Sequence, residues 1–156
     1  MTTVRDYRPI DAEALAALYV ASVLELGARR YAPDQVRAWA GLAPSAERLE
    51  ALMSDGRARL VATDDSDTPL AFADLEPDGH IHFFYAHPRA AGTDAAPMLY
   101  EALEARARTS RIERLYAEAS ETATGFFRRR GFHVLGRRDF EVSGVAIHNH
   151  AIEKRL

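Results

Sequence analysis

Three short apolar segments separated only by tight turns lie in the middle of this chain, with helical patterns before and after them. These segments predict three successive strands at residues 59–63, 70–75 and 80–86, joined by the turn sequences DDSD and PDG. Strands joined by such short turns pair as an antiparallel meander. This arrangement excludes the strict strand and helix alternation of a doubly wound parallel sheet.

The flanking segments complete the expected order. Residues 4–8 predict a first strand, and Asp11 is the expected N-cap of a helix that ends near Gly27. Further patterns predict helices at 33–41, 45–53, 95–108 and 121–130, a strand at 115–119, and a final hairpin of 134–142 and 145–153. We therefore expect an α/β fold of the α+β type, with a mixed, mainly antiparallel sheet and helices on both faces, in a single domain over residues 1–156.

Composition limits the chemistry that the chain can perform. The 156 residues contain no cysteine, which excludes a disulfide framework, a thiolate zinc site and a cysteine nucleophile. The net charge of −3 offers no broad basic surface for nucleic acid or for an anionic membrane. No apolar run approaches the roughly 20 residues that span a bilayer, and the first residues, MTTVRDYRP, lack the pattern of a signal peptide. We expect a cytoplasmic protein with neither a nucleic-acid nor a membrane partner.

Several sequence segments, taken in order, resemble the GCN5-related N-acetyltransferase (GNAT) superfamily over essentially the whole chain. These segments are HFFYAHP followed by a loop and MLYEALEARAR, then ASETATGFFRRRGF, and finally VAIHNHAIEKRL. More narrowly, YAPDQVRAWA together with EASETATGFFRRRGF and EKRL is similar to a bacterial subgroup of uncharacterised acetyltransferases. The resemblance implies a six- to seven-stranded sheet that is splayed between its fourth and fifth strands.

The resemblance also implies that acetyl-CoA is the acyl donor. Free backbone groups near Phe84, Tyr85 and Ala86 would bind the pantetheine arm, and donors near Tyr85 would polarise the thioester carbonyl. The pyrophosphate would lie on a loop and the N-terminus of the next helix, where unpaired N–H groups favour an anion. The positions that the resemblance assigns to this loop are Ala91, Gly92, Thr93, Asp94, Ala95 and Ala96.

The chain departs from the family pattern in two regions, and the first is the loop. The family's loop begins with Gln or Arg, continues with any two residues, a Gly and any one residue, and ends with Gly or Ala. Counted without a gap, the three defined positions fall on Ala91, Asp94 and Ala96, of which only Ala96 matches. A register shifted to begin at Arg89, with Gly92 as its glycine, matches two positions. We expect the Asp94 carboxylate to cap the helix, compete with the phosphate and weaken cofactor binding, so that Asp94→Gly would strengthen it.

The second departure concerns the proton that the leaving thiolate takes up. Phe127 stands where the family often has a tyrosine that supplies this proton, so we expect the thiolate to leave without a dedicated side-chain acid. Ser120 replaces the asparagine that is common at the start of this helix, and it can cap the helix and contact the cofactor arm.

Histidines and aromatic residues supply the candidate catalytic and acceptor groups. His80 and His82 alternate onto one strand face, where a histidine with an ordinary pKa near 6.5 can accept a proton from an ammonium substrate. The alternatives are a pair of solvent-facing histidines, or a metal site together with His87, for which no carboxylate at suitable spacing is evident. Other candidates for the acceptor pocket are Trp39, Tyr31, His148 and His150. The alternative is core packing for Trp39 and exposure on a strand face for His148 and His150.

The leading hypothesis is an acetyl-CoA-dependent N-acetyltransferase that acts on a small amine by direct attack in a ternary complex. Without cysteine, no acyl-enzyme on a thiol is possible. The alternative is a protein of the same fold that has lost the cofactor loop and serves as a ligand-binding or interaction module. A histidine-based metalloprotein is the third hypothesis, although we assign no metal ligands. A homodimer is the family-level expectation.

Overall fold

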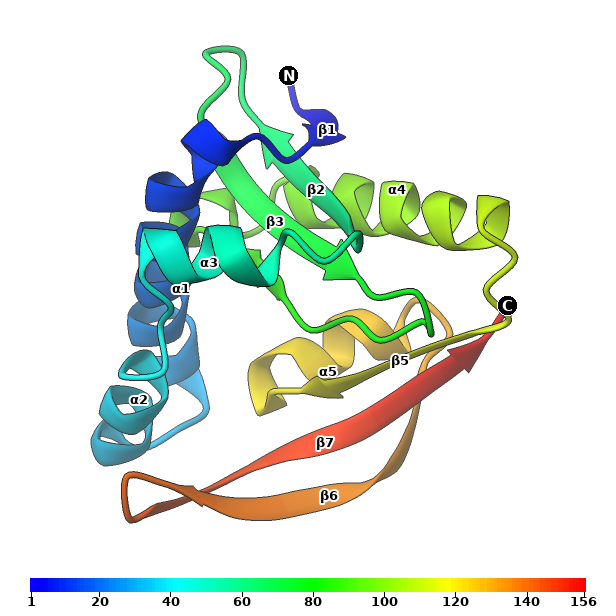
Figure 1. Cartoon of the computed structure of the whole chain (residues 1–156). Coiled ribbons are helices and arrows are strands. Elements are labelled where there is room, and N and C mark those ends of the chain that lie inside the picture. Colours follow the sequence, from blue (N-terminus) through cyan, green and yellow to red (C-terminus); the bar gives the residue numbers. More distant parts are fainter.

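The computed structural model describes all residues 1–156, and its elements follow the expected order (Figure 1). The N-terminal part contains β1 (Thr3–Asp6), α1 (Ala12–Glu25), α2 (Pro33–Ala40) and α3 (Ala46–Leu52). The meander follows as β2 (Ala58–Thr63), β3 (Pro69–Leu75) and β4 (Phe84–Ala86). The C-terminal part contains α4 (Ala95–Thr109), β5 (Arg114–Ala119), α5 (Glu121–Arg128), β6 (His133–Val142) and β7 (Val145–Arg155). None of the helices is both long and apolar enough to span a bilayer.

The seven strands form two antiparallel sheets that separate between β4 and β5. One sheet has the order β1-β2-β3-β4 and the other has the order β5-β7-β6. A single parallel bridge between His80 and Tyr116 joins them. In Figure 1 the three-stranded sheet lies below the four-stranded one, and the two diverge toward the end at which α1 and α2 stand. The splay expected between the fourth and fifth strands is confirmed.

Helices cover both faces of the meander because its strands are apolar on both sides. Leu60 and Ala62 of β2 belong to a core that includes α4 and α5, whereas the intervening Val61 belongs to a second core with α1, α2 and α3. Phe72 of β3 lies in the second core, between neighbours that lie in the first. The first core also takes in Leu115 of β5, so the two sheets share one apolar interior although their ladders are separate.

The segment before β4 departs from the strand predicted at residues 80–86, because only Phe84–Ala86 pairs regularly with β3. Asp74 explains the difference. One oxygen of its fully buried carboxylate accepts the N–H of Phe83 at 2.6 Å, and the other accepts from the Arg57 guanidinium at 2.6 Å. A side chain therefore occupies the place of a backbone acceptor, and the chain bulges toward β5 instead of continuing the ladder.

Gly79 brings this bulged segment against β5. Its φ is +98°, and a Cβ at this position would lie 1.9 Å from the carbonyl oxygen of Arg114. The Gly79 carbonyl accepts the N–H of Tyr116 at 3.1 Å, and the N–H of Ile81 donates to the Tyr116 carbonyl at 2.9 Å. Only glycine allows this approach, which fixes the point from which the two sheets diverge.

Asp11 does not cap α1, which corrects the expectation from sequence. A short 3₁₀ turn precedes the helix, and Asp11 already has helical dihedral angles of −75° and −20°. Its buried carboxylate instead accepts from both terminal nitrogens of Arg5, at 2.8 and 2.9 Å, and from the N–H of Arg8 at 2.8 Å. The carboxylate thus links β1 to the start of α1.

The analysis of the bulge predicts that Asp74→Ala lowers the free energy of unfolding by about 3 kcal/mol, because it leaves the Phe83 N–H without its acceptor and removes a buried partner of Arg57. Denaturant unfolding measures this loss. Asp65→Ala is the matched control, since Asp65 pairs with the N-terminal amine at 81% side-chain exposure and its removal should cost less than about 0.5 kcal/mol. Equal losses for the two variants would contradict the role given to Asp74.

Candidate functional site

The opening between β4 and β5 exposes backbone groups that no strand pairs. Phe83 accepts from the N–H of Asp74, and His87 donates to the carbonyl of Leu70, so these residues direct their backbone groups toward β3. In an antiparallel ladder this direction alternates, which turns the groups of Phe84 and Ala86 toward the opening and those of Tyr85 toward Phe72 of β3. The expectation that the Tyr85 backbone is free is therefore corrected in favour of its two neighbours.

One cavity of about 330 Å³ lies on the side of the opening next to α4, and we refer to it as the α4 cavity. Several residues expected to hold acetyl-CoA line it, namely Phe84, Tyr85, Ala86, Ala91, Gly92, Ala96, Ser120 and Phe127. The walls also include Trp39 from α2 and Arg129 after α5. Thr93, Asp94 and Ala95 do not line it, which corrects three of the positions assigned to the loop.

Three N–H groups at the N-terminus of α4 are unpaired, and two of them, those of Gly92 and Ala96, belong to residues that line this cavity. Gly92, Asp94 and Ala96 donate to no protein acceptor, while the N–H of Ala95 is taken by the Thr93 hydroxyl at 3.3 Å. Gly92 has a φ of +78°, so the loop can turn immediately before the helix. Unpaired amides together with the positive end of a 15-residue helix favour an anion such as a phosphate.

Asp94 does not cap α4, contrary to the expectation from sequence. Its dihedral angles of −81° and 0° are helical rather than extended, and its side chain makes no capping hydrogen bond. The carboxylate instead accepts from the hydroxyl of Thr2 at 2.6 Å. The direct competition between this carboxylate and an anion for the helix amides is therefore absent.

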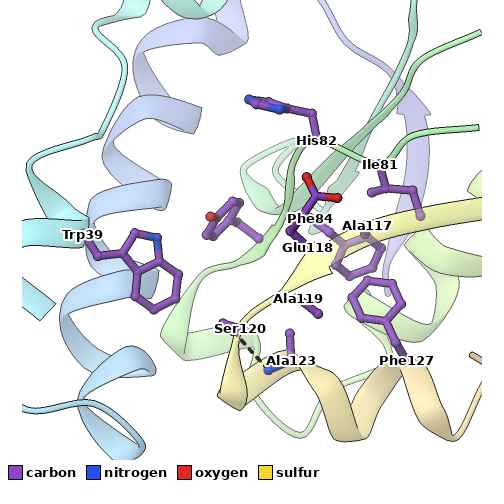
Figure 2. A pocket seen from close by; sticks show the side chains of 11 residues that line it. Trp39, Ile81, His82, Phe84, Ala117, Glu118, Ala119, Ser120, Ala123 and Phe127 are labelled. Carbon is purple, nitrogen blue, oxygen red and sulfur yellow. Dashed lines mark hydrogen bonds between the residues drawn. The ribbon is translucent and has the colours of Figure 1, made fainter. Parts of the chain in front are cut away.

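Phe127 closes the inner wall as part of an aromatic cluster. Its side chain is buried, and its ring centroid lies 5.3 Å from that of Phe84 and 5.0 Å from that of Phe132. Figure 2 shows Phe84 and Phe127 side by side, and shows Ser120 at the start of α5, where its hydroxyl accepts the N–H of Ala123 at 3.2 Å. Ser120 thus caps α5 as expected.

A second cavity, of about 460 Å³, lies on the other side of the opening, and we refer to it as the α3 cavity. Its lining combines apolar side chains with a few polar and charged groups, the latter being His82, Glu118, Arg48, Arg138 and Asn149. Trp39 and Tyr85 line both large cavities. Burial raises the pKa of Tyr85 well above its usual range, so its hydroxyl keeps its proton.

Glu118 and His82 line the α3 cavity but not the α4 cavity. Both also line a narrow space of about 50 Å³ between the strands, together with Phe84 and Phe127. In Figure 2 the Glu118 carboxylate projects from β5 toward the side on which His82 lies, and the two phenylalanine rings lie on the opposite side. Glu118 was not identified from sequence, although a glutamate inside an otherwise apolar strand is the signal that points to it.

His80 lies between two carboxylates and does not have the ordinary histidine pKa assumed from sequence. Its Nε2 is 3.0 Å from Glu118 and its Nδ1 forms a short hydrogen bond with Glu76. The bond to Glu118, and then that to Glu76, raise the pKa of His80 to about 9, against the opposing effect of burial. His80 is therefore an imidazolium at neutral pH and cannot accept a proton there, which leaves His82 as the base candidate of the pair.

Of the other residues predicted to contact the acceptor, only one lines the α3 cavity. Trp39 lines the α3 cavity. Tyr31 does not: its hydroxyl is engaged by the N–H of Glu121 at 2.8 Å and by the carbonyl of His148 at 2.9 Å. His148 and His150 lie on the strand face opposite to Asn149, and both Nε2 atoms contact one oxygen of Glu121, at 2.8 and 2.7 Å. Of these three β7 residues, it is Asn149 that lines the α3 cavity.

Carboxylates that the sequence did not reveal complete both histidine pairs. Glu76 lies beside His80 and His82, and Glu121 lies beside His148 and His150, with the potential ligand atoms of each trio within 4.8 Å of one another. Both nitrogens of His80 already bind carboxylates, so His80 offers no lone pair to a metal. The contacts of Glu121 have ordinary hydrogen-bond lengths, and these bonds hold α5 against β7.

Comparison with known proteins gives consistent matches. The family model described as an acetyltransferase (GNAT) domain matches residues 28–154. A crystal structure from Rhodopseudomonas palustris, described as a GCN5-related N-acetyltransferase and as an aminotransferase of class II, is 35% identical, covers 100% of this chain and 96% of its own, and superposes with a TM-score of 0.90.

Two more distant relatives agree with this match. The PaiA N-acetyltransferase of Thermoplasma acidophilum, solved in complex with coenzyme A, shares the fold at 20% identity, covering 100% of this chain and 99% of its own with a TM-score of 0.78. The uncharacterized N-acetyltransferase YafP of Escherichia coli K12 is 24% identical over 142 residues, which is 91% of this chain and 88% of YafP.

The charge assigned to His80 is directly measurable by NMR titration of the imidazole resonances. We expect the His80 midpoint near pH 9, and Glu118→Gln should move it down toward the ordinary range. Glu121→Gln, which removes the carboxylate of the other histidine pair, is the control and should leave the His80 midpoint in place. Because this pKa is raised on folding, its contribution to stability is complete below pH 6.5 and is lost as the pH rises through 9. A wild-type midpoint near 6.5 would refute the charged state.

Proposed function

Because the chain belongs to the GNAT family of acetyltransferases, and is therefore an acyltransferase, we propose that it transfers the acetyl group of acetyl-CoA to a small primary amine. The observation that carries this proposal is the position of the two cavities. The α4 cavity and the α3 cavity lie on opposite sides of the opening between β4 and β5, and Trp39 and Tyr85 line both. A donor and an acceptor held in them would meet at the opening.

The residues of the α4 cavity fit acetyl-CoA. The backbone groups of Phe84 and Ala86 would hold the amides of the pantetheine arm as an added strand would. The unpaired N–H groups of Gly92 and Ala96 would hold the pyrophosphate. Acetyl-CoA supplies an activated acyl group as a thioester when it is bound.

Proton transfer is the task left to the side chains. The nitrogen of a primary ammonium loses two protons in all: one before it attacks, which frees its lone pair, and one after the carbon–nitrogen bond has formed. The departing sulfur gains one proton when the carbon–sulfur bond breaks, and the other proton is taken by a base. Glu118 attracts the ammonium and His82 accepts the proton, either directly or through water. His80, as an imidazolium, fixes Glu118 in its ionised form: its hydrogen bond is the main cause that lowers the pKa of Glu118.

The proton for the departing sulfur does not come from Phe127. Tyr85 lines both cavities and its hydroxyl keeps its proton, which makes it the candidate side-chain donor for this step. If solvent supplies the proton instead, the step needs no side chain at all, because a thiolate is a tolerable leaving group.

Ala96→Asp provides a test of cofactor binding that separates it from stability. A carboxylate in the first turn of α4 favours the helix, so folding should be preserved, but it repels a phosphate at the same amides. We expect wild-type protein to bind acetyl-CoA in a calorimetric titration and the variant to bind at least about tenfold more weakly, with Ala96→Asn as the uncharged control.

Failure of the wild-type protein to bind acetyl-CoA would contradict the proposal. It would favour the alternative of a ligand-binding or interaction module, for which Ala91, in place of the family's Gln or Arg, is the supporting observation.

The pH dependence of turnover tests the proton acceptor. An imidazole accepts a proton only when it is neutral, so kcat/KM should fall on the acid side of its profile. In His82→Gln the rate should drop by at least about tenfold and the acid limb should move or vanish. His133→Gln, a change at an exposed histidine of β6, is the control. An unaltered acid limb in His82→Gln would remove His82 from this role.

A further inference from the structure

The α3 cavity holds more positive than negative charge. Two guanidiniums, of Arg48 and Arg138, face one carboxylate, of Glu118, so the charged lining sums to +1 in a chain whose net charge is −3. We propose that this cavity selects primary amines that also carry a carboxylate, and that Arg138 and Arg48 hold that anionic group. The inference rests on the proposed function and adds the chemical class of the acceptor.

Arg138 is positioned for an anion by the pairing of β6 with β7. It lies opposite Asn149 in the ladder, and one terminal nitrogen donates to the Asn149 side-chain oxygen at 3.2 Å. The guanidinium carbon lies 5.7 Å from the centroid of the Phe140 ring. Arg138 forms no ion pair with any carboxylate of the chain, so most of its five N–H donors are available to a ligand.

Arg48 reaches the cavity from a different layer. It belongs to α3, in the N-terminal half of the molecule, whereas β6 belongs to the C-terminal half (Figure 1). Its guanidinium makes neither a hydrogen bond nor an ion pair within the chain, and the only hydrogen bond of this residue outside the helix ladder is from its backbone N–H to Ser45. Arg48 is therefore a second, less constrained cation for the same anionic group.

Glu118 forms no ion pair with either arginine, and its carboxylate instead contacts the His80 imidazolium at 3.0 Å. Arg138 is nonetheless close enough for its charge to help lower the pKa of Glu118. The negative charge of Glu118 and the positive charges of the arginines orient the acceptor. Its ammonium end is drawn to Glu118 at the opening, and its anionic end is drawn to the arginines away from the opening.

The remaining walls fit an apolar body between these two ends. Trp39, Leu52 and Phe140 line the cavity, as does Leu42, whose side chain is 55% exposed. Large apolar side chains that remain exposed at the mouth of a cavity are typical of a ligand-binding surface. An amine with an aromatic or aliphatic body and a carboxylate matches all three features.

Matched pairs of amines test the inference. L-phenylalanine and phenethylamine differ by the carboxylate alone, and 6-aminohexanoate and hexylamine form a second pair with a longer separation between the charges. Binding of each amine to protein saturated with coenzyme A is measured by calorimetry, and acetylation is measured as kcat/KM with acetyl-CoA. In at least one pair, the carboxylate member should bind at least about tenfold more tightly and, where transfer occurs, react with the higher kcat/KM.

Variants connect this preference to the arginines. Arg138→Gln should reduce the preference for the carboxylate member to less than about threefold, through weaker binding of that member, and Arg48→Gln should weaken the preference by a smaller factor. Arg137→Gln is the matched control: Arg137 is the next residue of β6, pairs with Asp139 at 3.0 Å and does not line the cavity.

The outcomes separate the proposed transferase function from the proposed anion subsite. Tighter binding of a carboxylate member that Arg138→Gln abolishes supports the anion subsite even without acetylation, in which case only the transferase function fails. Acetylation with a preference for the neutral members upholds the function and overturns the inference. A preference that survives Arg138→Gln, or no binding of any of the four amines, also overturns it.

Discussion

A buried carboxylate determines where this fold opens. Asp74 accepts the N–H of Phe83 with one oxygen and pairs with Arg57 through the other, so the chain before β4 cannot continue a regular ladder with β3. It bulges toward β5, where Gly79 allows the two backbones to meet, and from this point the sheets diverge. The free backbone groups of β4, both large cavities and the position of Glu118 all follow from that divergence. Figure 2 shows Glu118 at the narrow space between the strands.

A chain of charges extends from the same bulge to the candidate site. Arg57 contacts Asp74 and Glu76, Glu76 binds His80, and His80 binds Glu118 at the edge of the α3 cavity. Because each carboxylate of this network has a cationic partner, Glu118 remains ionised. Arg48 and Arg138 in the α3 cavity have no carboxylate partner. The network that shapes the fold therefore also sets which charges an acceptor meets.

The fold was largely predictable from sequence, and the site was predictable only in part. Turn sequences and apolar periodicity identified the elements because these signals are local, and the resemblance to the GNAT superfamily implied the splay. The roles of Asp11 and Asp94 were not predictable in this way: both stand at helix starts, but their partners, Arg5 and Thr2, are set by tertiary packing. The prediction that His80 is a base was wrong for the same reason. Glu118 lies 38 residues away in sequence, and its contact with His80 keeps the imidazole protonated at neutral pH. Glu118, Arg48 and Arg138 come from three separate elements, and only the folded cavity brings them together.

The central claim is that the opening between β4 and β5 is the place where acetyl-CoA binds. Backbone amide NMR during a titration with coenzyme A tests it most directly, because each relevant N–H reports separately. The account predicts that the amide resonances of Phe84, Ala86, Gly92 and Ala96 shift with one common binding curve. Shifts confined to the surface cavity of about 460 Å³ near Tyr100 and Lys154, or no saturable shifts at all, would contradict it.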